Sequence, residues 1–142
     1  MDHVVYVDAK ANEMEALLNG EKTMIIRGAA GRKLPYDRVN AGDNLYFLNN
    51  NGEGQVKGKA VVSDVFNSKK MTKEESITLV EENQDKLKLT KKQLNHWAGK
   101  RYIVLIEVKS VEAIEAFNID KSDYGNMDDW LPVENIENVK EI

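Results

Sequence analysis

The order of strand-like and helix-like segments constrains this chain more than any other feature. Apolar, β-branched runs at 3–7, 23–26, 44–48 and 55–66 dominate the first half, and a further β-rich run at 102–108 follows two helical segments. Strands and helices therefore do not alternate as a parallel βαβ sheet requires, and the order favours an α+β fold. A small closed or nearly closed β-barrel of mixed or antiparallel strands, with short helices at its periphery, would bury such strands.

Local signals place the helices and a bend. Apolar residues recur at helical spacing over 11–18, and Asn19-Gly20 then supplies a C-terminal turn. Gly58 lies inside a strand-like run and predicts a bulge or a bend where the barrel curls. Two capping-box patterns predict two short helices, Thr72 with Glu75 and Thr90 with Gln93.

The length of 142 residues fits one domain. The patterns are clear over a core of about 3–110 and weaken in an acidic C-terminal extension of about 113–142. Residues 113–119 could form a further strand or a short helix, and Trp130 could cover one end of the barrel. We therefore expect a single domain that spans 1–142. As the oligomeric state, we favour a monomer.

Composition excludes several classes of protein. The chain has no cysteine, so disulfides, thiolate metal sites and cysteine nucleophiles are excluded. Its two histidines, His3 and His96, are far apart in sequence, and we expect neither a metal site nor a cofactor. No apolar run approaches the roughly 18 residues that a membrane span needs, and no signal-peptide pattern opens the chain. We expect a cytoplasmic protein.

Charge is unevenly distributed along the chain. The formal net charge is −4, which argues against a protein that binds duplexes through a wholly basic surface. Residues 20–40 nevertheless contain five basic and two acidic side chains, whereas 117–142 contain two basic and seven acidic ones. An anionic ligand would bind the first of these segments.

One segment carries a family resemblance. Residues 20–27, Gly-Glu-Lys-Thr-Met-Ile-Ile-Arg, and the turn Ala41-Gly42-Asp43 before the next strand resemble the signature of the ASCH family, a branch of the PUA-like β-barrels. Ile25 stands where that signature often has Glu. The resemblance covers about 3–110 and implies a barrel whose cleft presents Lys22 and Arg27. Related domains bind RNA, or modified bases and nucleosides.

The resemblance and the local charge suggest a set of ligand-binding residues. Lys22 and Arg27 differ by five positions, so on an ideal strand they face opposite sides; either Lys22 precedes the strand, or one of the two is structural. Trp97 either lines the cleft as a stacking surface or belongs to the core. The other candidates lie in the loop that we expect at 28–40, where solvated loop charge is the alternative: Arg32, Lys33 and Arg38 as cationic groups and Tyr36 as a stacking ring.

A catalytic alternative also follows from the resemblance. Some small ASCH proteins are amidohydrolases that act on N4-acylated cytidines with a Lys, a Thr three residues later and a downstream Glu. Lys22 matches the Lys, and Asp85, or Glu82 with a shifted alignment, could supply the carboxylate. The Thr position is Ile25, which has no hydroxyl and cannot act as a nucleophile.

The leading hypothesis is a non-enzymatic module that binds RNA or a nucleotide-like ligand through a basic cleft. The amidohydrolase is the runner-up. A reader of modified DNA bases and a protein-interaction domain that uses the acidic C-terminal segment are further alternatives.

Overall fold

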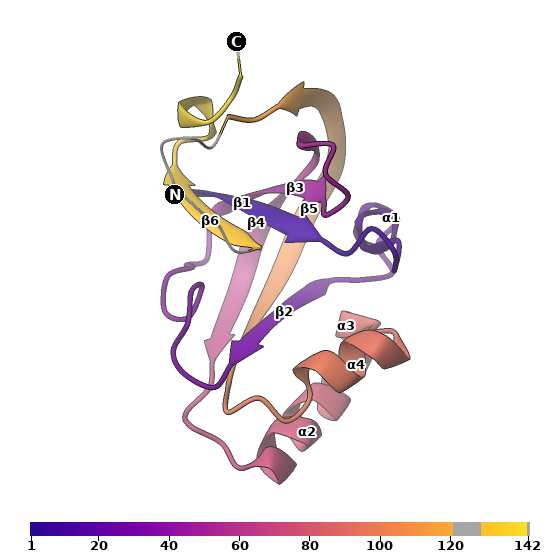
Figure 1. Ribbon diagram of the computed structural model, residues 1–142, viewed down its shortest axis with the longest axis vertical. Coiled ribbons are helices and arrows are strands. Elements are labelled where there is room, and N and C mark those ends of the chain that lie inside the picture. Colours follow the sequence, from indigo (N-terminus) through magenta and orange to yellow (C-terminus); the bar gives the residue numbers. More distant parts are fainter. Residues whose placement is uncertain (121–128, 142) are drawn as a thin grey trace.

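The computed structural model describes residues 1–120 and 129–141, and its framework is one curled sheet (Figure 1). The order of the strands is β2-β5-β4-β3-β1-β6, in which β1 and β3 are parallel and the other neighbours are antiparallel. The sheet is mixed and forms a half-barrel, so the predicted α+β class and the predicted nearly closed barrel of mixed strands are confirmed. The strands are β1 (Asp2–Val7), β2 (Met24–Ala29), β3 (Asn44–Asn49), β4 (Gln55–Asn67), β5 (Tyr102–Asn118) and β6 (Trp130–Glu134).

Short helices lie at the periphery, as predicted. Helix α1 spans Glu13–Leu18, and α2 (Lys73–Glu82), α3 (Gln84–Leu87) and α4 (Lys91–Trp97) lie together beside β2 (Figure 1). Both capping boxes are present, at the first residues of α2 and α4. Gly20 has a φ of +82° in the turn after α1, a conformation that glycine adopts without strain.

Strand β2 and the first part of β5, up to Val108, are largely buried on both faces, which explains their continuous apolar sequences. On the inner face of the curled sheet, Ile25 and Ile106 belong to the main core. On the outer face, Ile26, Ile103 and Leu105 pack in a second core that includes residues of the helices. Strand β2 is therefore fixed between the half-barrel and α2–α4.

The C-terminal segment is part of the sheet. Strand β5 continues to Asn118, so 113–118 extend a strand that was predicted to end near residue 108. Strand β6 pairs with β1, and Trp130 is fully buried in the main core. After β6, the 3-10 helix η2 (Ile136–Asn138) covers the outer face of β1 and β3. The part of the acidic segment at 121–128 lies outside the described residues.

Gly58 marks an irregularity in β4, as the sequence indicated. The pairing of β4 with β5 shifts register between Val56 and Gly58. A Cβ atom on Gly58 would lie 3.1 Å from the Met14 sulfur of α1. The glycine therefore allows α1 to pack closely on the inner face of the sheet.

A buried polar chain joins three parts of the sheet. The indole N–H of Trp130 donates to Nδ1 of His3 over 3.0 Å, and Nε2 of His3 lies 2.8 Å from Oδ2 of Asp43. Because the indole nitrogen only donates, Nδ1 carries no proton, and Nε2 donates to the carboxylate of Asp43. Burial lowers the pKa of His3, against the raising effect of Asp43. The folded protein therefore holds His3 neutral.

Acidification is expected to destabilise the fold through His3. In the unfolded chain the pKa of His3 returns to about 6.5. Between the folded and unfolded pKa values the unfolded state binds more protons, so the free energy of unfolding falls as the pH drops below about 6.5. Each pKa unit between the two states corresponds to about 1.4 kcal/mol. Urea denaturation across pH 5 to 7.5 should show a shallower pH dependence for His3→Gln, which does not titrate.

The second histidine provides the control. His96 is exposed and takes no part in the buried chain of Trp130, His3 and Asp43, so His96→Gln should leave the contribution of His3 in place. If the free energy of unfolding depended on pH identically in the wild type and in His3→Gln, the role assigned to a buried, neutral His3 would be contradicted.

Candidate functional site

Arg27 spans the open side of the half-barrel. It extends from β2, the first strand of the sheet, toward β1 and β6 at the other end. Its Nη2 donates to the carbonyl oxygen of Tyr6 over 2.6 Å, and its Nη1 donates to the carbonyl oxygen of Ile26 over 2.7 Å. Its Nε lies 2.9 Å from Oδ2 of Asp129, directly before β6. Arg27 thus connects the two ends of the sheet.

The guanidinium retains binding capacity. Although Nε is within ion-pair distance of Asp129, the contact lacks the alignment of a hydrogen bond, and Nε has no hydrogen-bond partner among the described residues. The carbon Cζ lies 5.8 Å from the ring centroid of Trp97 and 5.7 Å from that of Trp130. Of five N–H donors, two point to carbonyls, so others remain for a ligand. The charge is held between two aromatic rings.

Lys22 lies beneath this region, not on the surface. Its side chain is only 2% exposed, and Nζ lies 3.3 Å from Oε2 of Glu13 and 2.5 Å from the carbonyl oxygen of Leu87. Burial lowers the pKa of Lys22, and the charge of Glu13 opposes this effect. Lys22 precedes β2, so the question of which side of an ideal strand it faces does not arise, and its contacts connect α1 to the last residue of α3.

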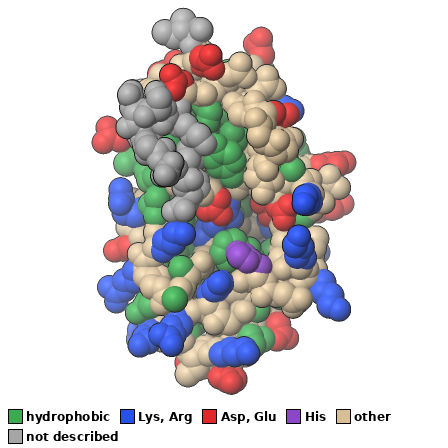
Figure 2. Space-filling view, in the orientation of Figure 1, with side chains coloured by type: hydrophobic (Ala, Val, Ile, Leu, Met, Phe, Trp, Pro, Cys, Tyr) green, Lys and Arg blue, Asp and Glu red, His purple; other side chains and the backbone are tan. Residues whose placement is uncertain are grey.

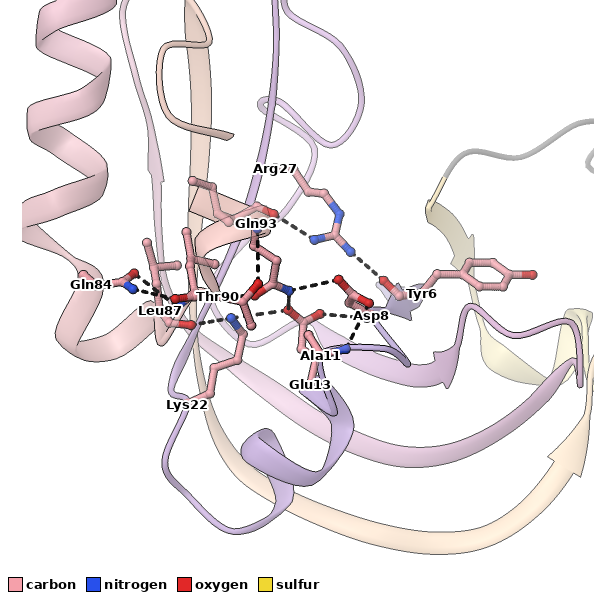
Figure 3. A network of polar contacts seen from close by, with 12 residues as sticks. Tyr6, Asp8, Ala11, Glu13, Lys22, Arg27, Gln84, Leu87, Thr90 and Gln93 are labelled. Carbon is pink, nitrogen blue, oxygen red and sulfur yellow. Dashed lines mark hydrogen bonds and ion pairs between the residues drawn. The ribbon is translucent and has the colours of Figure 1, made fainter. Parts of the chain in front are cut away.

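Glu13 is the centre of the polar network in Figure 3. Its Oε1 accepts from the backbone N–H of Asp8, and its Oε2 accepts from the side-chain amide of Gln93 over 3.3 Å. The same amide donates to Oδ2 of Asp8. The network therefore fixes α1 against α4, and it leaves Asp8, Glu13 and Gln93 on the wall of a cavity.

Two adjoining hollows form the candidate site. The first has a volume of about 250 Å³, and the second has a volume of about 380 Å³. Four residues line both hollows, namely Arg27, His96, Trp97 and Asp129. Figure 2 shows a hollow in the middle of this face, with Lys and Arg side chains on either side of it. We call the two hollows together the cleft.

The cleft contains cationic, aromatic and acidic groups. Lys92 lines the first hollow, and Lys33 and Lys100 line the second. The rings of His96 and Trp97 meet edge to face at 4.4 Å between centroids. Asp8 and Glu13 place carboxylates in the first hollow. Such a site can hold a planar ring, a phosphate and a hydrogen-bond donor together.

The predicted site residues occupy different positions relative to the cleft. Arg27, Lys33 and Trp97 line it, and Trp97 also packs on the second core, so both predicted roles of Trp97 apply. Lys22 does not line it but supports Glu13, which does. As ligand contacts, all of these residues remain predictions.

The remaining loop residues belong to a packed segment. The hydroxyl of Tyr36 donates to the carbonyl of Ser68, and its ring lies edge to face against Tyr102 at 5.6 Å. Cζ of Arg32 lies 5.7 Å from each of these two rings. Arg38 is exposed. The loop after β2 is thus held against the sheet by side-chain contacts.

The carboxylates near Lys22 differ from the predicted ones. Asp85 is exposed on α3, and Glu82 is exposed on α2. The carboxylates whose charges act on Lys22 are those of Glu13 and Asp8. Ile25 is fully buried in the main core, so no hydroxyl occupies the Thr position of the hydrolase pattern.

Sequence reasoning missed the polar wall of the cleft. Asp8 and Glu13 lie together at the junction of β1 and α1, whereas Gln93 lies on α4, and only the fold brings these two segments together. His96 was not considered as a ligand-binding residue. Asp8 directly follows β1, and its Oδ1 accepts the backbone N–H groups of residues 10 and 11. One signal was available: Glu13 stands four residues before Leu17, on the face that the apolar residues of the helix share, and it is buried there in the structure.

Some classes of site find no support in the described residues. Within 1–120 and 129–141, no group of three or more His, Asp and Glu side chains is placed to hold a metal ion. In the same residues, no helix has the length and apolarity to cross a membrane.

Replacing Lys22 by Met should strongly destabilise the protein. The substitution leaves Glu13 buried without its cation, and breaking a buried pair from one side costs about 3–5 kcal/mol. Urea denaturation measures the free energy of unfolding. The double variant Glu13→Gln/Lys22→Met should recover part of the loss, because no buried charge is left unpaired.

The exposed pair Lys57–Glu53 provides the matched control. Its atoms are 2.8 Å apart, but both side chains are solvated, so Lys57→Met should have a much smaller effect than Lys22→Met. Equal effects of the two substitutions would refute a buried, structural role for Lys22.

The comparisons with known proteins support the fold. No family model matches the chain, and no curated protein matches it. Among solved structures it is similar to ASCH from Zymomonas mobilis, with a TM-score of 0.65 at 17% identity over 94% of this chain and 89% of that chain. Two mutant structures of that protein give TM-scores of 0.64 and 0.63 at 16% and 17% identity. They cover 89% and 90% of this chain and 84% and 82% of the mutant chains.

Proposed function

Because this chain has the fold of an ASCH domain, we propose that it is a cytoplasmic module that binds RNA or a nucleotide-like ligand in the cleft. The observation that carries the proposal is the position of Arg27 and Trp97 on the shared wall of both hollows. An arginine and an indole ring side by side match the two chemical parts of a nucleotide, its phosphate and its base.

Each part of the cleft has a role in the proposal. The half-buried ring of Trp97 stacks on a base, and Arg27, with Lys33 and Lys100, attracts the phosphate. The carboxylate of Asp8 and the amide of Gln93 lie in the first hollow and form hydrogen bonds with the edge of the base. The ligand is therefore recognised as an unpaired nucleotide, since a base within a duplex cannot be stacked in this way.

Lys22 acts on the ligand indirectly. Its ammonium group is buried against Glu13 and the carbonyl of Leu87, so it cannot reach a phosphate without breaking these contacts. In the proposal it is a positioning residue, which holds the carboxylate of Glu13 in place on the wall of the cleft.

Tryptophan fluorescence can report binding at this site. The chain has two tryptophans, and only Trp97 lines the cleft, whereas Trp130 is fully buried. Titration with single-stranded RNA of mixed sequence or with the four nucleoside monophosphates should change the emission of the wild type. The change should persist in Trp130→Phe and disappear in Trp97→Phe, which retains a ring for stacking.

The variant Trp97→Leu tests the energetic contribution of the ring. Loss of stacking on one base corresponds to about 1–3 kcal/mol, so the affinity should fall by roughly 5- to 150-fold. Urea denaturation of Trp97→Leu checks that the fold survives, because the side chain also packs on the second core. An unchanged affinity in a folded Trp97→Leu protein would refute the proposal.

The amidohydrolase remains a second candidate because Lys22 and a carboxylate lie together next to the cleft. With Ile25 in place of the hydroxyl residue, we expect no turnover. Incubation with N4-acetylcytidine and chromatographic detection of free cytidine tests this expectation. Release of cytidine by the wild type that is lost in Glu13→Gln would establish the enzyme.

A further inference from the structure

Three segments that are distant in sequence meet beside the second hollow. They are the segment after β2, the β4–α2 connection and the α4–β5 connection. Ser68 links the β4–α2 connection to the other two parts of the chain. Its carbonyl accepts from the hydroxyl of Tyr36, and its backbone N–H donates to the carbonyl of Ile103 over 2.9 Å. The backbone N–H of Met71 donates to the carbonyl of Arg101 over 2.9 Å.

These segments form a basic surface. A Cβ atom on Gly99 would lie 3.5 Å from Cγ of Lys73, which brings the start of α2 against the α4–β5 connection. The acidic neighbours are Asp37 in the segment after β2, and Glu74 and Glu75 in the first turn of α2. We call the surface the loop platform, and its cationic residues are Arg32, Lys33, Lys69, Lys70, Lys73, Lys100 and Arg101.

Three of the platform's cations are available to a partner. Lys69, Lys70 and Arg101 are exposed, and none of the ion pairs between described residues includes them. Clustered cations without partners repel one another, and in a chain of net charge −4 such a cluster indicates a surface for an anion. The lower half of the face in Figure 2 shows this gathering of Lys and Arg side chains.

The platform is continuous with the cleft. Lys33 and Lys100 belong to the platform and also line the second hollow, next to Arg27 and Trp97. Arg32 is held over the rings of Tyr36 and Tyr102, so its charge has a defined position. A chain of phosphates that leaves the cleft past Lys33 and Lys100 would therefore meet further cations at its next positions.

We propose that the loop platform binds the phosphodiester backbone of a single strand, one base of which occupies the cleft. The proposal rests on the proposed function and extends it: the ligand is an oligonucleotide, not a free nucleotide. The cleft supplies the contacts to the base, and the platform supplies an electrostatic contribution that grows with the number of phosphates.

A length series tests the proposal. The probes are cytidine monophosphate and fluorescein-labelled single strands of two, four and eight nucleotides of mixed sequence, with separate RNA and DNA series. For the wild type we expect at least a tenfold gain in affinity from the monophosphate to eight nucleotides at about 100 mM salt. The affinity should fall as salt rises, because counterions are released from the strand. The RNA and DNA series show which sugar is preferred.

The test variant is Lys69→Glu/Lys70→Glu/Arg101→Glu, which changes three exposed side chains and none that lines the cleft. It should lose the gain with length while binding of the monophosphate, followed by the emission of Trp97, stays the same. The slope of log affinity against log salt should become shallower by about 2, since single strands contribute about 0.7 per neutralised phosphate.

A matched control separates local from global charge. Lys88→Glu/Lys109→Glu/Lys140→Glu changes net charge by the same amount at exposed positions outside the platform, and it should bind eight nucleotides as the wild type does. Urea denaturation verifies that both triple variants are folded. The platform proposal would be overturned if the affinity of the wild type did not rise with strand length, or if both triple variants lost affinity for eight nucleotides equally. Absence of any signal from Trp97 with every probe would instead overturn the proposed function.

Discussion

The side chain of Arg27 closes a sheet that its backbone leaves open. Strands β2 and β6 are the two ends of the sheet order and are not neighbours in it, so main-chain hydrogen bonds do not seal the half-barrel. The planar guanidinium reaches the carbonyl of Tyr6 and the carboxylate of Asp129 at the same time, from a position 7% exposed. A lysine has a single ammonium group and could not connect these groups in fixed directions. The architecture and the cleft thus depend on the same residue.

The buried network around Glu13 shows how the cleft obtains polar walls inside a small core. A buried carboxylate is tolerated when it is paired and hydrogen-bonded, and Lys22, Gln93 and the backbone of Asp8 provide these contacts. Lys22 is in turn satisfied by the carbonyl of Leu87. The lysine of the GxKxxxxR pattern therefore has a structural explanation, and the arginine of the same pattern contributes directly to the cleft.

Much of the fold could be predicted from local signals, whereas the site depends on long-range contacts. The two threonine capping boxes and the bend at Gly58 follow from residues a few positions apart, and all three are present. The pairing of β6 with β1 could not be predicted, because β6 is only five residues long, contains Pro132, and pairs with a strand at the opposite end of the chain. The burial of Lys22 could not be predicted from the sequence either. The sequence shows a basic residue, and only the fold reveals that Glu13 lies beside it and pairs with its charge.

Because the cleft lies on the open side of the half-barrel, binding of a ligand in it is coupled to the stability of the fold. Trp97 comes from the helical side, Tyr6 and Asp129 from the opposite end of the sheet, and Arg27 lies between them. A molecule held by both sides acts as a cross-link, and its binding free energy adds to the free energy of unfolding by mass action. Thermal melting with and without a candidate compound is therefore a direct screen for occupants of the cleft, independent of their optical properties or turnover.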